Sequence, residues 1–382
     1  MIDPPTNRVE LAAARRLVVK VGSSSLTDQA GRLNPDRLDR LVHAMAAHVG
    51  AGHQVVLVSS GAQAAGIEPM GLNRVPKDLA QAQAAASVGQ GRLMAHYTRA
   101  FTARGIQVGQ VLLTAQDVIR RTHYRNVLRV LGELLHRSIV PIVNENDAVA
   151  TDEIRFGDND RLAALVAHLV RADGLILLTD VDGLYDAPPG RPGARRISEI
   201  KNSDQLAAIE VTGRGSAVGT GGMVTKVQAA TMATSSGIPV LLTAAEQIGQ
   251  ALDGADVGTF FQVTGRRVAA RRMWLGYAAK MNGCLIVDAG AAKAITVGKN
   301  SLLPVGVIAV IGEFDAGDPV EIVDPDGIVL ARGQTGFPAA VLNRVKGWDL
   351  SRIEAELGED HAVPAVHRDD MVTQARSRRP HP

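Results

Sequence analysis

Short apolar runs alternate along most of the chain with longer segments in which apolar residues recur every three or four positions. The apolar runs are 16–21, 54–58, 108–114, 139–143, 175–178, 238–243 and 258–263. The longer segments are 34–50, 78–104, 123–136, 162–170 and 226–233. The first pattern is typical of buried strands, and the second is typical of helices with one buried face. Strands and helices that alternate in this order predict an α/β fold built on a parallel sheet.

The pattern changes near Gly283, where helical spacing gives way to short β runs separated by Gly, Asp and Pro. These runs are 285–287, 305–311, 320–323 and 328–331, and they predict a small β-barrel-like domain. The predicted divisions are a flexible leader at 1–15, an α/β domain at 16–265, a linker helix at 266–282, the β-rich domain at 283–372 and a disordered tail at 373–382.

Composition narrows the class of protein. At 382 residues the chain is long enough for two domains with a core each. Only 3% of the residues are aromatic and the formal net charge is +2, so neither base stacking nor net charge favours a nucleic acid or a membrane as partner. Cys284 is the single cysteine, which excludes an internal disulfide. We find no secretory signal and no uncharged apolar run of about 18 residues, so we expect a cytoplasmic protein without a membrane span.

Polar residues follow several predicted strands directly. Gly22 and Ser23 come after the first strand, Ser60-Gly61 after the second, and Thr179-Asp180 after the strand at 175–178. The acidic stretch 144–160 (NENDAVATDEIRFGDND) follows the strand at 139–143, and a glycine-rich segment (219–226, GTGGMVTK) precedes a predicted helix. Ligands of α/β sheets bind beyond the carboxyl ends of the strands, so we expect these residues to face one site.

Each of these features alone also has a purely structural interpretation. Lys20, inside the first strand, fits either an edge residue whose ammonium group reaches solvent or a functional cation. The acidic stretch fits either a solvated hairpin or a site, and segment 219–226 fits either a flexible turn or a phosphate loop. Asn159 or Asp160 stands where a helix N-cap is expected. Taken together, two lysines, glycine-rich loops and carboxylates at one edge suit phosphoryl transfer, with a polyphosphate as donor.

Six motifs make the chain resemble the glutamate 5-kinases of the amino acid kinase superfamily. They are KVGSSSL at 20–26, VSSGAQAAG at 58–66, VNENDAVA at 143–150, FGDND at 156–160, LLTDVDGLY at 177–185 and GTGGMVTK at 219–226. The resemblance covers roughly residues 15–372 and is most specific in NENDAVA and GDND. The C-terminal region, ending in AVHRDDM at 365–371, resembles a PUA domain. The resemblance implies an open, mainly parallel sheet sandwiched by helices, followed by a small PUA barrel.

The resemblance also implies an activity. This activity is the ATP-dependent phosphorylation of the L-glutamate side-chain carboxylate, the first step of proline biosynthesis, with Mg²⁺ bound only through the ATP phosphates. Lys20 and Lys226 are implied to stabilise the transferred phosphoryl group, and Asp160 to hold both lysines. The implied glutamate-binding residues are Ser60, Gly61, Asn144, Asp147, Asp158 and Asn159. The implied ATP-binding residues are Lys20, Gly22, Ser23, Thr179, Asp180, Thr220, Gly221, Gly222, Met223, Val224, Thr225 and Lys226.

Val224 departs from the family, which often has a small hydroxyl residue at this position, and segment 187–195 has no assigned role. The family further implies inhibition by proline at or overlapping the glutamate pocket, and a homo-oligomer, dimer or tetramer. One alternative is a sibling kinase acting on another carboxylate, carbamate or phosphate. Another is an RNA-binding protein, but residues 281–360 carry six Lys/Arg against twelve Asp/Glu, which disfavours phosphate binding there.

Overall fold

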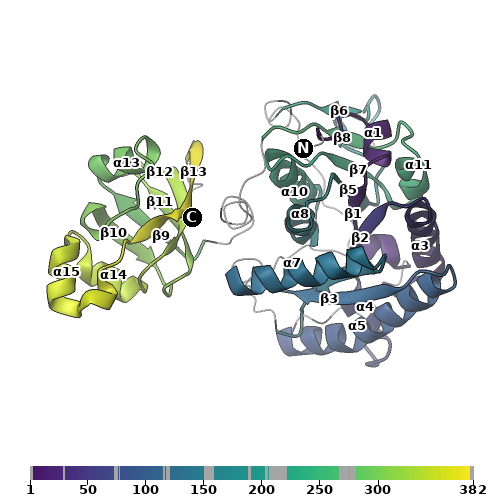
Figure 1. Ribbon diagram of the computed structural model, residues 1–382, viewed down its shortest axis with the longest axis horizontal. Helices are drawn as coiled ribbons and strands as arrows, with labels where there is room; N and C mark the ends of the chain where they lie inside the picture. The colour runs from purple at the N-terminus through teal and green to yellow at the C-terminus, as the bar shows by residue number, and fades with distance from the viewer. Residues whose placement is uncertain are drawn as a thin grey trace. The chain divides into compact units, whose positions relative to one another are not determined.

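The computed structural model describes residues 3–28, 31–72, 76, 78–114, 117, 121–149, 159–187, 191–202, 205, 222–265, 275 and 281–378. The chain divides into two compact units, Met1–Ala270 and Arg271–Pro382 (Figure 1). Among the helices described, none combines the length and the apolar character needed to cross a membrane.

Strand β1 lies in the middle of the eight-stranded sheet of the larger unit, whose order is β3-β4-β2-β1-β5-β7-β8-β6. From β3 to β7 all neighbouring strands are parallel, whereas β8 is antiparallel to β7. The strands are β1 Arg16–Val21, β2 Gln54–Ser59, β3 Val108–Leu113, β4 Val140–Glu145, β5 Gly174–Thr179, β6 Glu199–Ile200, β7 Val240–Ala244 and β8 Thr259–Phe261. The predicted α/β fold with a mainly parallel sheet is therefore confirmed.

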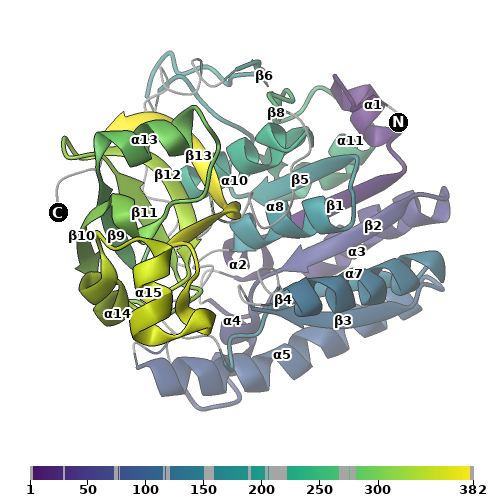
Figure 2. The same cartoon turned by 60° about the vertical axis from the view of Figure 1, so that its left-hand side comes forward.

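Helices cover both faces of this sheet (Figures 1 and 2). Those of the larger unit are α1 Arg8–Ala12, α2 Ser23–Leu26, α3 Pro35–Gly50, α4 Ala62–Ile67, α5 Leu79–Thr102, α7 Arg121–His136, α8 Asn159–Leu169, α10 Met223–Ser235 and α11 Ile248–Leu252, the last preceded by the 3₁₀ turn η1 Ala245–Gln247. One core joins α3, α5 and α11 to alternate residues of β1, Leu17, Val19 and Val21. The intervening residues of β1 point to the opposite face, where α8 packs against α10 and β1.

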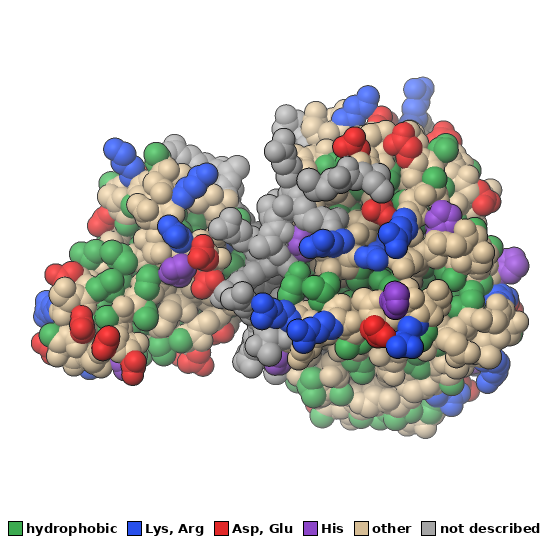
Figure 3. All heavy atoms as spheres, viewed as in Figure 1, with side chains coloured by type: hydrophobic (Ala, Val, Ile, Leu, Met, Phe, Trp, Pro, Cys, Tyr) green, Lys and Arg blue, Asp and Glu red, His purple; other side chains and the backbone are tan. Residues whose placement is uncertain are grey.

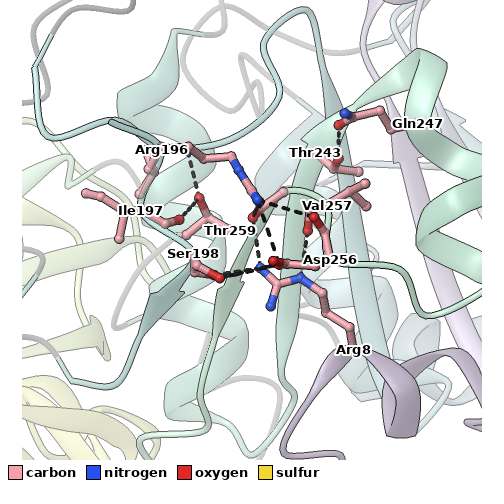
Figure 4. A network of polar contacts seen from close by, with 11 residues as sticks. Arg8, Arg196, Ile197, Ser198, Thr243, Gln247, Asp256, Val257 and Thr259 are labelled. Carbon is pink, nitrogen blue, oxygen red and sulfur yellow. Dashed lines mark hydrogen bonds and ion pairs between the residues drawn. The ribbon is translucent and has the colours of Figure 1, made fainter. Parts of the chain in front are cut away.

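The N-terminal residues differ from the flexible leader that the sequence predicts. Asn7 caps α1 through its side chain, and Leu11 of this helix is fully buried. Arg8 donates from Nε to the carbonyl of Val257 (2.7 Å) and from a terminal guanidinium nitrogen to the carbonyl of Ser198 (2.7 Å) (Figure 4). One buried leucine and one arginine thus fix a segment whose polar composition suggested no structure.

The smaller unit contains a five-stranded sheet in the order β10-β9-β11-β12-β13. Its strands are β9 Gly283–Val287, β10 Val307–Gly312, β11 Pro319–Val323, β12 Ile328–Thr335 and β13 Val366–Arg378. Its helices are α13 Ala289–Thr296, α14 Ala339–Val345 and α15 Leu350–Leu357, with 3₁₀ turns η3 Pro304–Gly306 and η4 Glu359–His361. β13 pairs with β12 as far as Arg378 and so enters the predicted tail at 373–382. The predicted linker helix at 266–282 lies almost entirely outside the described residues.

Candidate active site

The carboxyl ends of three neighbouring parallel strands meet at one edge of the large sheet. In the register of the central strands, Val21 at the end of β1 lies beside Ser59 of β2 and Leu178 of β5. The next residues along these strands are Gly22, Ser60 and Thr179, so the strand pairing brings together groups that are far apart in sequence. This edge is where a parallel α/β sheet binds ligands.

Two long helices begin at the same edge. Asn159 is the first residue of α8, and Gly222 precedes the first residue of α10, Met223. The first N–H groups of a helix lack intrahelical partners and, together with the helix dipole, favour anions. Gly61 precedes α4 with a φ of 97°, a left-handed backbone conformation that glycine adopts without strain.

Asp160 links two lysines that come from different parts of the chain. One carboxylate oxygen, Oδ1, lies 2.5 Å from Nζ of Lys20, and the other, Oδ2, lies 3.2 Å from Nζ of Lys226. Thr225 donates from Oγ1 to Oδ2 at 3.1 Å. The contact is possible because Lys20 points from β1 to the face that carries α8 and α10.

Burial strengthens the ion pairs between these three side chains. Lys20 is 1% exposed, Asp160 is 0% exposed and Lys226 is 7% exposed. Charges removed from water are stable only when they are paired, so each lysine depends on the carboxylate between them. The interpretation of Lys20 as an edge residue that reaches solvent is wrong, because this side chain is enclosed and ion-paired.

A chain of side-chain amides lies beside this cluster. Asn159 donates from Nδ2 to the carbonyl of Ser59 (2.6 Å), to Oδ1 of Asn144 (2.7 Å) and to Oγ of Ser60 (3.1 Å). Asn144 accepts a second hydrogen bond from the N–H of Glu145 at 2.9 Å. Three of the predicted glutamate-binding residues, Ser60, Asn144 and Asn159, are therefore in direct or shared contact.

Four more of the predicted residues lie at or just after the ends of β4 and β5 or in the first turn of α10. Thr179 is buried and donates to Oδ1 of the exposed Asp180 at 2.9 Å. Asp147 follows β4 in a turn and is half-buried. Val224, in the first turn of α10, is 49% exposed.

Some of the other predicted positions lie within the described residues, and others do not. Gly22 and Ser23, at the start of α2, and Met223 are half-buried. Asp158, Thr220 and Gly221 lie outside the described residues. Within the described ranges, no group of three or more His, Cys, Asp or Glu side chains is placed to hold a metal ion.

Two residues of helix α5 reach this site and were not among the predicted residues. Gln90 accepts a hydrogen bond from Nδ2 of Asn144 at 2.8 Å, and the hydroxyl of Tyr97 lies 2.9 Å from Oγ of Ser59. Burial raises the pKa of Tyr97, so this hydroxyl stays protonated. The only signal in the sequence was a pair of polar-tipped residues seven positions apart on a helix rich in Ala.

Comparisons with known proteins agree on the family to which the chain is similar. A model of the amino acid kinase family matches residues 15–244, and a model of the PUA domain matches residues 283–357. The chain is 55% identical to a glutamate 5-kinase of Streptomyces coelicolor over 96% of this chain and 98% of that protein. It is 53% identical to a glutamate 5-kinase of Bifidobacterium longum subsp. infantis over 95% of this chain and 96% of that protein.

Among solved structures, a carbamate kinase from Giardia lamblia bound to AMP-PNP aligns with a TM-score of 0.50. The alignment covers 66% of this chain and 100% of the carbamate kinase, at 19% sequence identity. At this level of identity the likeness concerns the fold alone.

Proposed function

Because the chain belongs to the amino acid kinase family, among the glutamate 5-kinases, we propose that it transfers the γ-phosphoryl group of ATP to the side-chain carboxylate of L-glutamate. The product is L-glutamyl 5-phosphate, and the reaction is the first step of proline biosynthesis. One observation in the structure supports this most strongly: two buried lysines share a single carboxylate at the ligand-binding edge of the sheet.

The reaction needs positioning and positive charge more than proton transfer. A glutamate side chain is already ionised at pH 7, so its oxygen can attack the γ-phosphorus without a general base. The bond from this phosphorus to the β–γ bridging oxygen breaks as the new P–O bond forms, and ADP leaves. Negative charge then spreads over the phosphoryl oxygens, where the ammonium groups of Lys20 and Lys226 would stabilise it. Asp160 keeps both ammonium groups charged and aligned, and is a positioning residue.

The amide chain would define the glutamate side of the site. Asn159 donates a hydrogen bond from Nδ2 to Oγ of Ser60. Because Ser60 accepts this hydrogen bond through its oxygen, its hydroxyl proton can be donated to a carboxylate of the substrate. Asp147, in the turn after β4, can accept from the α-ammonium group. The start of α10 at Gly222 suits the anionic phosphates of ATP. Mg²⁺ held by these phosphates would neutralise part of their charge.

Trapping the acyl phosphate tests this proposal. The chain is incubated with ATP, Mg²⁺ and hydroxylamine, and with L-glutamate, L-aspartate or N-acetylglutamate in parallel. Hydroxamate formed from L-glutamate alone is the expected result, since hydroxylamine attacks an acyl phosphate. Hydroxamate from another acid alone would refute the proposed substrate, and none from any acid would refute the proposed reaction.

Three further proposals rest on the resemblance. We propose that proline inhibits the enzyme at the glutamate pocket, that the enzyme forms a homo-oligomer in the cytoplasm, and that residues 16–265 and 283–372 are separate folding domains. Inhibition by proline is expected to weaken as glutamate rises. An inhibition constant that does not depend on glutamate would place proline elsewhere.

A further inference from the structure

We propose that one face of helix α5 positions the glutamate site, and that Gln90 is its main positioning residue. The inference rests on the proposed function, because it concerns binding of the acceptor substrate. Three adjoining contacts carry it: Gln90 with Asn144, Tyr97 with Ser59, and Gly89 with the start of α4.

A single backbone carbonyl fixes the orientation of the whole amide chain. The carbonyl of Ser59 can only accept, so the atom of Asn159 that lies 2.6 Å away is the amide nitrogen. The atom of Asn144 next to that nitrogen is therefore Oδ1, which agrees with the second hydrogen bond that it accepts from the N–H of Glu145. Nδ2 of Asn144 is then left to donate to Oε1 of Gln90.

Gln90 is the last residue of this series of hydrogen-bonded side-chain amides, and its side chain is buried. The residue is 9% exposed, and its Nε2 has no hydrogen-bond partner within the described part of the structure. An unpaired buried donor costs free energy, so stability alone does not account for a glutamine here. Its Oε1 instead holds Asn144, which with Asn159 sets the hydroxyl of Ser60.

Tyr97 supports the same strand end from about two turns further along α5. Gln90 and Tyr97 are seven residues apart, so they lie on one face of the helix. Ser59 donates from Oγ to the carbonyl of Ser60 at 3.0 Å, which leaves its oxygen to accept from the Tyr97 hydroxyl. The peptide between Ser59 and Ser60 is thus held from the α5 side.

Two glycines keep α5 close enough for these contacts. A Cβ atom on Gly89 would lie 1.8 Å from the carbonyl oxygen of Ala62, and one on Gly66 would lie 1.9 Å from that of Ala85. Helices α4 and α5 therefore touch through their backbones, directly after the Ser60-Gly61 turn. Close packing of the α4 and α5 backbones, together with the hydrogen bonds of Gln90 and Tyr97, therefore positions α5 at the site.

The test compares three variants that are nearly equal in size to the wild-type residues. Gln90→Met removes the acceptor for Asn144, Tyr97→Phe removes only the hydroxyl, and Gln81→Met changes an exposed glutamine of the same helix as a control. Steady-state kinetics give separate KM values for glutamate and ATP, and calorimetry gives the glutamate Kd without turnover. A role in folding alone would lower the active fraction, and with it kcat, at unchanged KM.

We expect Gln90→Met to raise both the glutamate KM and the glutamate Kd by about tenfold, the effect of one lost hydrogen bond. Tyr97→Phe should raise both by about threefold on the same grounds, and the ATP KM should change by less than about twofold in either variant. Wild-type glutamate constants in Gln90→Met, or equal increases in the glutamate and ATP KM values, would overturn the inference. Failure of the wild-type enzyme to form glutamyl hydroxamate would instead refute the proposed function.

Discussion

Replacing Asp160 with Asn removes one negative charge and leaves the shape of the side chain almost unchanged. The substitution therefore separates the charge of this residue from its packing. In the variant, Lys20 and Lys226 remain enclosed by the protein but lose the carboxylate that they share. A buried ammonium group without a counter-ion favours the neutral amine, which would remove the positive charge that the reaction uses.

The distances in the structure set the size of the effect. At an effective dielectric constant of about 20, unit charges 2.5 Å apart attract by about 7 kcal/mol, and charges 3.2 Å apart by about 5 kcal/mol. Desolvation offsets much of this attraction, and removal of one partner of a buried pair typically costs about 3–5 kcal/mol. We therefore expect Asp160→Asn to lower the free energy of unfolding by about that amount. Turnover should fall by about 100-fold or more, as for loss of a preorganised charge.

Urea unfolding and the hydroxamate assay measure these two losses. Glu133→Gln is the matched control, because Glu133 pairs with Arg137 on the surface, and such pairs contribute about 1 kcal/mol or less. Wild-type stability and turnover in Asp160→Asn would refute the argument that this carboxylate holds the two cations.

Three other predictions concern single residues. Lys226→Ala should lower kcat about 100-fold or more; near-normal turnover would remove Lys226 from the mechanism. Asp147→Ala should raise the KM of glutamate far more than that of ATP, and equal increases would make Asp147 structural. Burial and the neighbouring His53 lower the pKa of His48 to about 4, so the unfolded chain binds a proton that the folded chain excludes between about pH 6.5 and 4. Stability should therefore fall as the pH is lowered through this window. The full shift corresponds to about 2 kcal/mol at pH 5, and solvent screening of the partly buried ring reduces the expected loss to about 1 kcal/mol. Equal losses in wild type and His48→Gln between pH 7 and 5 would contradict this assignment.

The core elements of the larger unit could be predicted from sequence because their patterns are local. β1 and β2 are apolar and β-branched, and the strands found at Arg16–Val21 and Gln54–Ser59 match the runs at 16–21 and 54–58. Helix α3 carries its own start signal, since Asn34 accepts from two N–H groups of the first turn.

The missed elements depend on contacts rather than on local pattern. The short helices α13, α14 and α15 each bury a residue in the core of the smaller unit, namely Ile295, Leu342 and Ile353. Helices this short are held by packing and give little periodic signal, so the sequence indicated only the β runs around them. On the face of this unit seen in Figure 3, acidic side chains gather near α14 and α15, in agreement with the excess of acidic residues.

The residues of the site also fall into two groups, those that the local sequence pattern predicts and those that depend on contacts between distant segments. Positions at strand ends, such as Ser60 and Thr179, followed from the pattern because strand ends are visible in sequence. The pairing of Lys20 with Asp160 joins residues 140 positions apart, and only the resemblance to a family suggested it. The contact of Gln90 with Asn144 spans 54 positions, and the local pattern indicated only that Gln90 and Tyr97 share one face of a helix.

The central claim is that a glutamate carboxylate oxygen attacks the γ-phosphorus of ATP, and oxygen labelling tests it most directly. Glutamate labelled with ¹⁸O in the side-chain carboxylate is turned over with ATP and hydroxylamine, and the released phosphate is observed by ³¹P NMR. Hydroxylamine attacks the acyl carbon, so the bridging oxygen stays with phosphorus. The account predicts one ¹⁸O atom in each phosphate that is released. Unlabelled phosphate would show that water, and not glutamate, accepts the phosphoryl group.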